Sequence, residues 1–407
     1  MSQARDTVTG VRTGGAGPLR TYGPTVVLMT TSNLVYNMLF IILGAIATQR
    51  HYDERQIGFV GSAFLIGQTI ANLSGGWWVN RLDWRWVVML ASLGAVGFIL
   101  GAVSLPFVPF LVCYGCAGAM TGLILSCVFC GMSRLGDPVR AYSLSLVSQC
   151  VVAGALIYAA QVWVVPHFGL GGLNMLLAVC FATGAAAGAC LPRPPRRFAP
   201  GSPASEPTAR DGGRTGEAAS HRLSGVVALA GISIYFLGQT GVWAFLERIG
   251  ASKGFSPAFI GTATALVLVL CALGGSAATF TGTRLGVIRP IVLAQAIFVA
   301  SMAGLAFTSG RLPYFLALLT YASAWNYVLP YQMLIVSRFD AKGVLASMIP
   351  AFQSIGSSIG PAVVGTLVVG GFGYAGAYAM ACATAMISLT IFVMVVGRRG
   401  AAAAVPA

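Results

Sequence analysis

Charged side chains are scarce in this sequence. They make up 8% of its 407 residues, with only 10 Asp or Glu and 3 His, whereas an average water-soluble domain has about 25% charged residues. This shortage excludes a soluble globular protein, and it leaves few groups for acid-base catalysis or metal binding. The three histidines, His51, His167 and His221, are far apart and lie outside the apolar stretches. We therefore expect neither an enzyme nor a metal site.

The nine cysteines do not change this expectation. All of them lie in apolar stretches, where free thiols act as small apolar fillers. Cys113, Cys116, Cys127 and Cys130 have the spacing of a zinc motif. However, they share one predicted helix, in which Cys113 and Cys127 are about 21 Å apart at roughly 1.5 Å per residue. Ligands so spread cannot surround one ion, so we expect no metal and no other cofactor.

Long apolar stretches are what the sequence has instead. Hydrophobic residues make up 57% of the chain, and its mean hydropathy is +0.82. Each stretch is close to the roughly 20 residues that a helix needs to cross a bilayer, and none alternates as a membrane strand does. An all-α integral membrane protein follows. We predict twelve transmembrane helices, at 25–47, 56–79, 87–105, 109–132, 142–165, 170–191, 225–246, 256–280, 288–308, 312–336, 344–369 and 374–396.

The cations predict how these helices are oriented. With the amino terminus placed in the cytoplasm, 19 of the 24 Lys and Arg fall in inner segments. Because cytoplasmic loops of membrane proteins carry the excess of positive charge, we expect both termini inside the cell. The net charge of +14 is then a consequence of topology, and a nucleic-acid partner is not expected. The five outer cations are Arg50, Arg55, Arg248, Lys253 and Arg311.

A polar segment divides the chain. Residues 192–224 are rich in Pro, Gly, Ser and Ala without an apolar period, which predicts a disordered cytoplasmic linker. On either side we expect a six-helix half, at 24–191 and 225–396. The remaining residues, 1–23 and 397–407, are predicted cytoplasmic tails.

The two halves are related in sequence. Ile57-Gly58 recurs as Ile260-Gly261, and Arg81-Leu82 recurs as Arg284-Leu285, both 203 residues later. Ser133-Arg134, Gln149 and Phe168-Gly169 recur 204 residues later. Because five matches share almost one offset, we predict a duplicated unit and two pseudo-symmetric halves.

This organisation resembles the major facilitator superfamily, in which two six-helix halves bind substrate between them near mid-membrane. The family motif after helix 2 is approximately G-x-L-x-D-R-x-G-R-R. Here Gly76, Arg81 and Arg85 match it, while Asn80 replaces the acid and Asp83 the second glycine. The resemblance implies that these residues, with Arg284 in the second half, form a cytoplasmic gate in one access state. The alternative is that the arginines only anchor the topology.

The resemblance also places helices 1, 4, 7 and 10 around a central cavity. Polar and aromatic residues on these helices are the candidate substrate-binding residues. The alternative for each is a structural bond to a neighbouring helix, which membrane bundles commonly contain. Tyr114 stands where drug:proton antiporters of the family carry an arginine, so that class is disfavoured. The candidates are Asn33, Tyr36, Asn37, Tyr114, Tyr235, Gln239, Trp243, Tyr321, Trp325 and Asn326.

No Lys, Arg, Asp or Glu lies well inside a predicted span, and this absence of charge bears on the substrate. A buried charge costs several kcal/mol unless function requires it, so a strongly anionic substrate is disfavoured and a neutral or amphipathic one is predicted. Glu247, at the outer end of helix 7, comes closest to an intramembrane acid. It is either an interfacial anchor beside Arg248 or, where transport is coupled to protons, the coupling residue.

These observations predict a secondary transporter of a small organic solute in the cell membrane, a monomer with lipid and solute as partners. Export is preferred over uptake because no uptake motif is found. Two alternatives stay open: a facilitator or uptake permease of the same fold, and a membrane sensor or scaffold that does not transport. An intramembrane enzyme would need ionisable or metal-binding residues at depth, and no Lys, Arg, Asp or Glu lies well inside a predicted span.

Overall fold

The fold is a bundle of helices, as the apolar stretches predict. We analysed a computed structural model of the chain, which describes residues 18–79, 81–132, 138–191, 215–282, 284–339 and 344–403. Within these ranges the regular structure is entirely helical. In an apolar solvent a helix satisfies its own backbone hydrogen bonds, which is why lipid-embedded chains adopt it.

The first half contains seven α-helices and two short irregular turns. The break between α1 and α2 bends one span by 45°. The elements are α1 (Pro18–Asn37), α2 (Leu39–Arg50), α3 (Glu54–Trp78), α4 (Trp84–Gly101), η1 (Ala102–Ser104), α5 (Phe107–Met132), α6 (Pro138–Ala159), η2 (Ala160–Val164) and α7 (Val165–Ala189).

The second half contains eight α-helices and one irregular turn. Two of its spans are also interrupted, between α8 and α9 and between α10 and α11. The elements are α8 (Thr215–Ala244), α9 (Leu246–Ser252), α10 (Pro257–Leu270), α11 (Ala272–Thr281), α12 (Ile288–Phe307), α13 (Arg311–Arg338), α14 (Val344–Leu367), η3 (Val368–Phe372) and α15 (Gly373–Ala403).

The arrangement agrees with twelve membrane crossings. Two apolar spans are about twice as long as one crossing needs. They are Ser148–Ala189, with 42 residues, and Met348–Gly397, with 50. Each turns back on itself at a glycine. The helix α13 is long enough at 28 residues but is not among the strongly apolar spans, because it carries Tyr, Trp, Asn and Gln residues, three of which are predicted to line the cavity.

The turning points reveal the duplication in the backbone. Gly169 has φ of 56° and Gly373, 204 residues later, has φ of 55°. Both follow a π-helical turn, η2 or η3. Glycine adopts this left-handed region without the steric penalty of a Cβ atom. The matched Phe-Gly pairs therefore mark the same hairpin in both halves.

Helix breaks are also matched between the halves. Met38 separates α1 from α2 with φ of −93° and ψ of 6°. Phe245 separates α8 from α9 with φ of −106° and ψ of 8°. Interrupted helices in corresponding positions of two repeats are typical of transporter binding sites, so both breaks point to the region between the halves.

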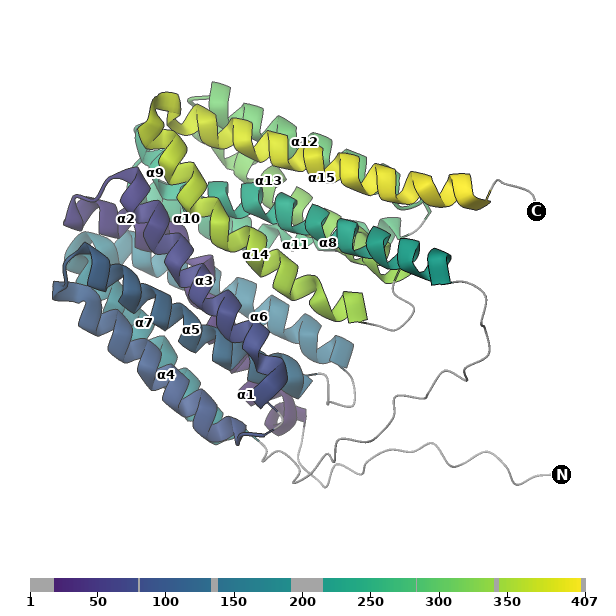
Figure 1. Cartoon of the computed structure of the whole chain (residues 1–407). Helices are drawn as coiled ribbons and strands as arrows, with labels where there is room; N and C mark the ends of the chain where they lie inside the picture. Colours follow the sequence, from purple (N-terminus) through teal and green to yellow (C-terminus); the bar gives the residue numbers. More distant parts are fainter. Residues whose placement is uncertain are drawn as a thin grey trace.

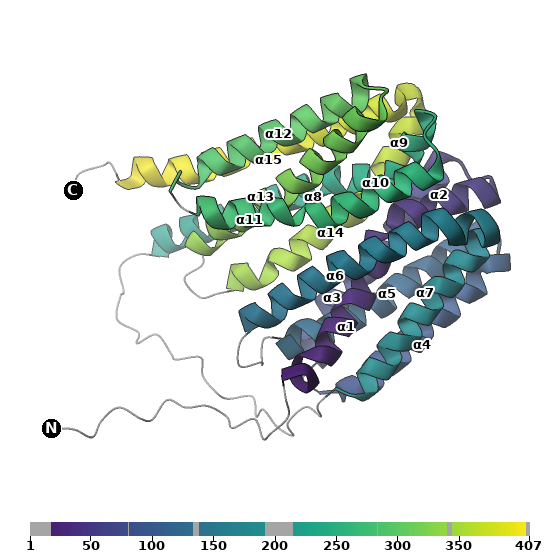
Figure 2. The ribbon, with the colours of Figure 1, turned by 180° about the vertical axis from the view of Figure 1, so that it is seen from behind.

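Figure 1 and the reverse view in Figure 2 show the halves side by side, with α1 beginning and α15 ending on the same side of the bundle. We call this the terminal side and the opposite one the far side. On the far side, α2 contacts α8 and α9, and α3 packs along α14. A second contact between the halves joins α6 to α10.

Several predicted boundaries differ from the observed ones. The helix α8 begins at Thr215, so the last ten residues of the predicted linker are helical, because Glu217, Ala218 and Ala219 favour helix. Residues 192–214 lie outside the described ranges. The helix α15 continues past residue 397, where Ala401, Ala402 and Ala403 also favour helix. The helix α1 begins before residue 23.

Candidate substrate path between the two halves

A polar network joins the two halves at the centre of the bundle. The hydroxyl of Thr240 on α8 lies 3.3 Å from the hydroxyl of Tyr36 on α1. It also lies 3.0 Å from the side-chain oxygen of Gln239 and 3.0 Å from the hydroxyl of Ser357 on α14. Hydroxyl and amide groups thus connect three helices without a charged side chain.

Two aromatic residues extend this network. The hydroxyl of Tyr321 on α13 donates to the backbone carbonyl of Gln239 at 2.7 Å. The indole nitrogen of Trp243 donates to the backbone carbonyl of Tyr36 at 3.2 Å. Four of the predicted binding residues, Tyr36, Gln239, Trp243 and Tyr321, therefore meet in one place.

Several other polar groups on these helices are buried without a hydrogen-bond partner among the described residues, those of Tyr235 and Gln332 included. Three of them are the amide nitrogens of Asn37 and Gln239 and the indole nitrogen of Trp325. Trp325 packs edge-on against Phe236 of α8, with ring centroids 6.3 Å apart. A buried donor left unpaired costs about 1–3 kcal/mol. A solute with hydrogen-bond acceptors would relieve this cost, so these three groups are candidate donors to substrate.

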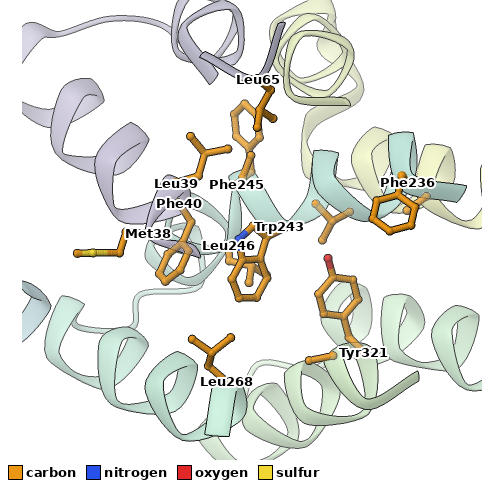
Figure 3. Packing of buried hydrophobic residues seen from close by; sticks show 14 of the residues in the cluster. Met38, Leu39, Phe40, Leu65, Phe236, Trp243, Phe245, Leu246, Leu268 and Tyr321 are labelled. Carbon is orange, nitrogen blue, oxygen red and sulfur yellow. The ribbon is translucent and has the colours of Figure 1, made fainter. Parts of the chain in front are cut away.

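An apolar cluster closes the path toward the far side. Phe40 of α2 and Trp243 of α8 face each other across the halves, with ring centroids 5.4 Å apart and planes at 78°. Figure 3 shows them among buried residues of both halves, including Met38 and Leu39 from the first and Leu268 from the second. This contact between buried apolar side chains blocks a polar solute from passing to the far side.

A charged contact lies further toward the far side. Arg248 of α9 donates to one carboxylate oxygen of Glu54 on α3, from Nε at 2.9 Å and from a terminal nitrogen at 2.7 Å. The hydroxyl of Tyr374 on α15 donates to the same oxygen at 3.0 Å. We call Glu54, Arg248 and Tyr374 the far-side lock, because it ties the start of α3 to two elements of the other half.

Glu247 is not paired with its neighbour Arg248, which instead bonds Glu54. Its carboxylate contacts Gly44 of α2 and occupies the space that a Cβ atom on that residue would fill. One of the two carboxylate oxygens is buried without a hydrogen-bond partner among the described residues. The residue lies beyond the apolar span 223–244. Burial raises the pKa of Glu247 to about 7, while the charge of Arg248 lowers it and that of Glu54 raises it.

Small residues let α3 and α14 approach closely. A Cβ atom at Gly58 would overlap the carbonyl of Pro361, and one at Gly365 would overlap the carbonyl of Glu54. The amide of Ala362 donates to the hydroxyl of Ser62 across the halves at 2.9 Å. Such small-residue contacts allow strong van der Waals packing between helices in lipid.

The contact between α6 and α10 repeats this arrangement. Gly261, which matches Gly58 in the duplication, lies against the side chain of Gln161. Further along the same contact, the thiols of Cys150 on α6 and Cys271, the residue after α10, lie within interaction range of each other. The duplicated glycine therefore lies at the boundary between the halves in both copies.

A partly open pocket lies between the halves toward the terminal side. It has a volume of about 580 Å³ and lies between α3 and α5 of the first half and α14 of the second. Asn72, Ser126 and Cys130 are its polar lining, with Met348 and Pro350 opposite them. The structure is thus closed on the far side and has a partly open pocket between α3, α5 and α14 on the terminal side.

Four predicted binding residues are placed away from the network. Tyr114 stacks on Phe110 of its own helix, and Tyr235 packs inside the second half against Phe298 of α12. Asn33 and Asn326 each bond a carbonyl four residues earlier in their own helix. Steps of three and four residues predict a shared helix face but not which neighbour that face meets.

The predicted gate residues lie on the terminal side. Arg81 and Arg284 are exposed, while Nε of Arg85 donates to the carbonyl of Leu191 at the end of α7. Asp83, which departs from the family motif, caps α4 by accepting from the amide of Arg85. Gly76 lies in α3, and Asn80 lies outside the described residues.

Sequence reasoning missed Glu54, Thr240 and Ser357. Glu54 begins a helix after the capping residue Asp53, so it looks like an ordinary residue of a helix start. Thr240 and Ser357 have small hydroxyls that usually bond their own helix. Among the described residues, no group of three His, Cys, Asp or Glu could hold a metal ion.

Comparisons with known proteins agree with this geometry. Residues 25–224 match the family model described as Major Facilitator Superfamily, and no curated protein sequence matches the chain. Solved structures show a similar fold. A D-xylose-proton symporter has a TM-score of 0.67 at 15% identity, covering 92% of this chain and 96% of its own.

Two further structures are similar over nearly their whole length. The nucleoside transporter NupG has a TM-score of 0.69 at 13% identity, covering 93% of this chain and 98% of its own. A bacterial homolog of the human lysosomal transporter Spinster, in an inward-facing and occupied conformation, has a TM-score of 0.68 at 14% identity, covering 94% of this chain and 97% of its own. At these identities the likeness concerns the fold alone.

Proposed function

The chain belongs to the major facilitator superfamily, and we propose that it is a secondary active transporter that moves a small neutral or amphipathic organic solute by alternating access. It acts in the cell membrane as a monomer, with both termini cytoplasmic. On this orientation the far side faces outward and the structure is the inward-open form. Reporter fusions at Ala199 and Ala404 test the orientation, and activity on the outer face contradicts it.

One observation carries the proposal. The halves are joined by the network of Tyr36, Thr240 and Gln239 in the middle and are closed beyond it by Phe40 and Trp243. The pocket of about 580 Å³ lies on the opposite side of this closure. Closure on one side, with a pocket between the halves on the other, fits one of the two states that alternating access requires.

The chemistry of the network favours a solute without strong negative charge. Its members are hydroxyl, amide and indole groups, and the unpaired groups of Asn37, Gln239 and Trp325 are donors. Such groups bind carbonyl, hydroxyl or ring nitrogen acceptors, while the aromatic rings suit a flat or apolar body. Export stays the proposed direction, on sequence grounds alone.

Proton coupling is the second part of the proposal, and it rests on Glu247. This carboxylate is buried at the contact between α2 and α9, where the two halves meet. A group that is neutral when buried and charged when exposed favours different access states at different pH values. Proton uptake at Glu247 would therefore support the closed far side.

The function is tested with purified protein in proteoliposomes. Thermal shift across a metabolite library identifies ligands, and flux of each ligand is then measured with and without a pH gradient. Gln239→Leu should weaken binding by about tenfold, the value of roughly one hydrogen bond. Gln295→Leu is the matched control, because Gln295 is buried and unpaired on α12. Loss of binding in the control alone, or no ligand at all, contradicts the proposal.

A further inference from the structure

A second cavity lies outside the path between the halves. It is a groove of about 520 Å³ between α12 and α15, bordered at one end by Ser252 and Lys253 at the end of α9. Its lining is mainly apolar and small, with Met302, Ala303 and Ala379 among the residues that form its walls. Ala303 and Ala379 are exposed, so the groove opens toward the surrounding lipid.

The groove begins at the membrane surface and runs inward. Its α12 wall extends from Phe307, the last residue of that helix, to Val299, and its α15 wall from Tyr374 to Cys382. Eight residues of helix correspond to roughly 12 Å. This depth is close to the thickness of one leaflet, because the hydrocarbon core is about 30 Å thick.

One cation marks the surface end of the groove. The Lys253 ammonium donates to the carbonyl of Thr308 at 2.7 Å, which uses one of its three donors. The carboxylate of Glu54 accepts a hydrogen bond from the wall residue Tyr374, and Arg248 pairs with this carboxylate. The groove therefore has positive charge at the surface and hydrocarbon-like walls below.

We propose that this groove binds an anionic phospholipid of the far-side leaflet, with one acyl chain along α12 and α15 and its phosphate at Lys253. Lipid chains fill apolar grooves on a membrane-facing surface, and cations at the interface attract anionic head groups. The match of depth, apolar walls and charge selects a phospholipid over a free anion, which would gain nothing from the walls.

The site is connected to the far-side lock. Tyr374 is both a wall residue of the groove and the donor to Glu54 of the other half. A chain packed against Tyr374 restrains its ring in the position that makes this bond. Bound anionic lipid should therefore favour the form that is closed on the far side.

Native mass spectrometry of the full-length protein tests the site. Phosphatidylglycerol and phosphatidylcholine with the same chains are titrated separately. Lys253→Glu should lower phosphatidylglycerol occupancy at least fivefold while leaving phosphatidylcholine unchanged. Ala379→Phe, which fills the groove, should lower both. Ala379→Met is a milder second variant, because Met175 occupies the matching position of the first half.

Two control variants separate this site from general attraction. Arg311→Glu removes an exposed far-side cation that lies over Phe259 and does not border the groove. Ala182→Phe enlarges an exposed alanine on α7. Both should bind lipid as the unmodified protein does. The proposal would be overturned if the control variants lost as much phosphatidylglycerol as Lys253→Glu, or if Lys253→Glu bound it as the unmodified protein does. It would also be overturned if glycerol phosphate, which has no acyl chains, bound as tightly as phosphatidylglycerol.

Discussion

At the residue scale, the path between the halves is built from polar groups that carry no charge. Tyr36, Gln239 and Tyr321 are linked to one another through hydrogen bonds to side chains and carbonyls of facing helices. The acidic and basic side chains lie apart from them, at the far-side lock and at Glu247. Recognition and energy coupling are therefore expected to depend on different residues.

Glu247→Gln should abolish solute accumulation driven by a pH gradient and leave solute exchange intact. The variant mimics the protonated carboxyl permanently, so the gradient no longer acts on it. Proteoliposome uptake and counterflow measure the two activities. Asp83→Asn is the control, because asparagine also caps a helix and Asp83 caps α4 on the terminal side. Gradient-driven transport that persists in Glu247→Gln removes this residue from the mechanism.

The pKa of Glu247 also predicts a pH dependence. In the closed form its pKa is about 7, against an ordinary value of 4.5, so the closed form holds its proton more tightly than a form with an exposed carboxylate. The form closed on the far side is therefore favoured most at low pH. As pH rises from 4.5 to 7, the ratio of this closed form to the form open on the far side should fall by on the order of a hundredfold. Accessibility of a cysteine placed near Phe40 should rise over this window and stay constant in Glu247→Gln.

The far-side lock should stabilise closure by a modest amount. Glu54 and Arg248 side chains are 15% and 31% exposed, so their pairing is worth about 1 kcal/mol, or roughly a fivefold change in the ratio of forms. Glu54→Gln should open the far side by that factor, as measured by cysteine labelling. The exchanged pair Glu54→Arg with Arg248→Glu should restore closure. A double variant that opens further than either single one would show that the charge pair is not the cause.

At the scale of elements, helix breaks and small residues decide where the halves touch. The breaks at Met38 and Phe245 redirect α2 and α9 toward each other on the far side. Gly58 and Gly261 then allow close contact at α3 with α14 and at α10 with α6. Because the two contacts come from matched glycines, one duplicated feature supplies both edges of the boundary.

The contact between α6 and α10 can be tested with two native cysteines. A copper-phenanthroline catalyst, with oxygen as electron acceptor, should oxidise Cys150 and Cys271 to a disulfide. This bond should cross-link the two halves and stop transport. Dithiothreitol should restore it, because reduction returns both thiols. Cys150→Ser should resist inhibition, whereas Cys190→Ser, at an exposed thiol, should not. Inhibition that persists in Cys150→Ser points to another cysteine.

At the scale of the whole molecule, the fold pairs two copies of one unit and closes them on a single side. Gly169 and Gly373 make equivalent hairpins, and Arg81 and Arg284 lie in equivalent loops. Both arginines are exposed while the pocket on the terminal side is present. This placement fits groups that find partners only when the terminal side closes.

Replacing Arg81 and Arg284 together with Ala should therefore shift the protein toward the form observed here. Labelling of a cysteine at Ser126, in the terminal-side pocket, should increase in the double variant. Arg289→Ala removes another exposed terminal-side arginine and should leave labelling unchanged. Equal labelling of the double variant and the unmodified protein would mean that the two arginines only anchor the topology.

The sequence by itself determined the class of molecule. Length and spacing of apolar stretches predict the helices because crossing hydrocarbon requires about 20 residues each, and a repeat offset predicts the two halves because duplication preserves order. The apolar spans and the matched hairpins at Gly169 and Gly373 agree with both predictions. The sequence also placed Tyr36, Gln239, Trp243 and Tyr321 among the candidates that later proved to meet.

Only the tertiary structure decided which polar groups find one another. Arg248 is adjacent to Glu247 in the chain but bonds Glu54, 194 residues away. Tyr235 has the composition of a cavity residue but faces Phe298 within its own half. Helix periodicity fixes the relative direction of side chains on one helix, whereas the rotation of that helix and its partner depend on packing summed over the whole bundle. A pairing between distant helices is therefore visible only once the chain is folded.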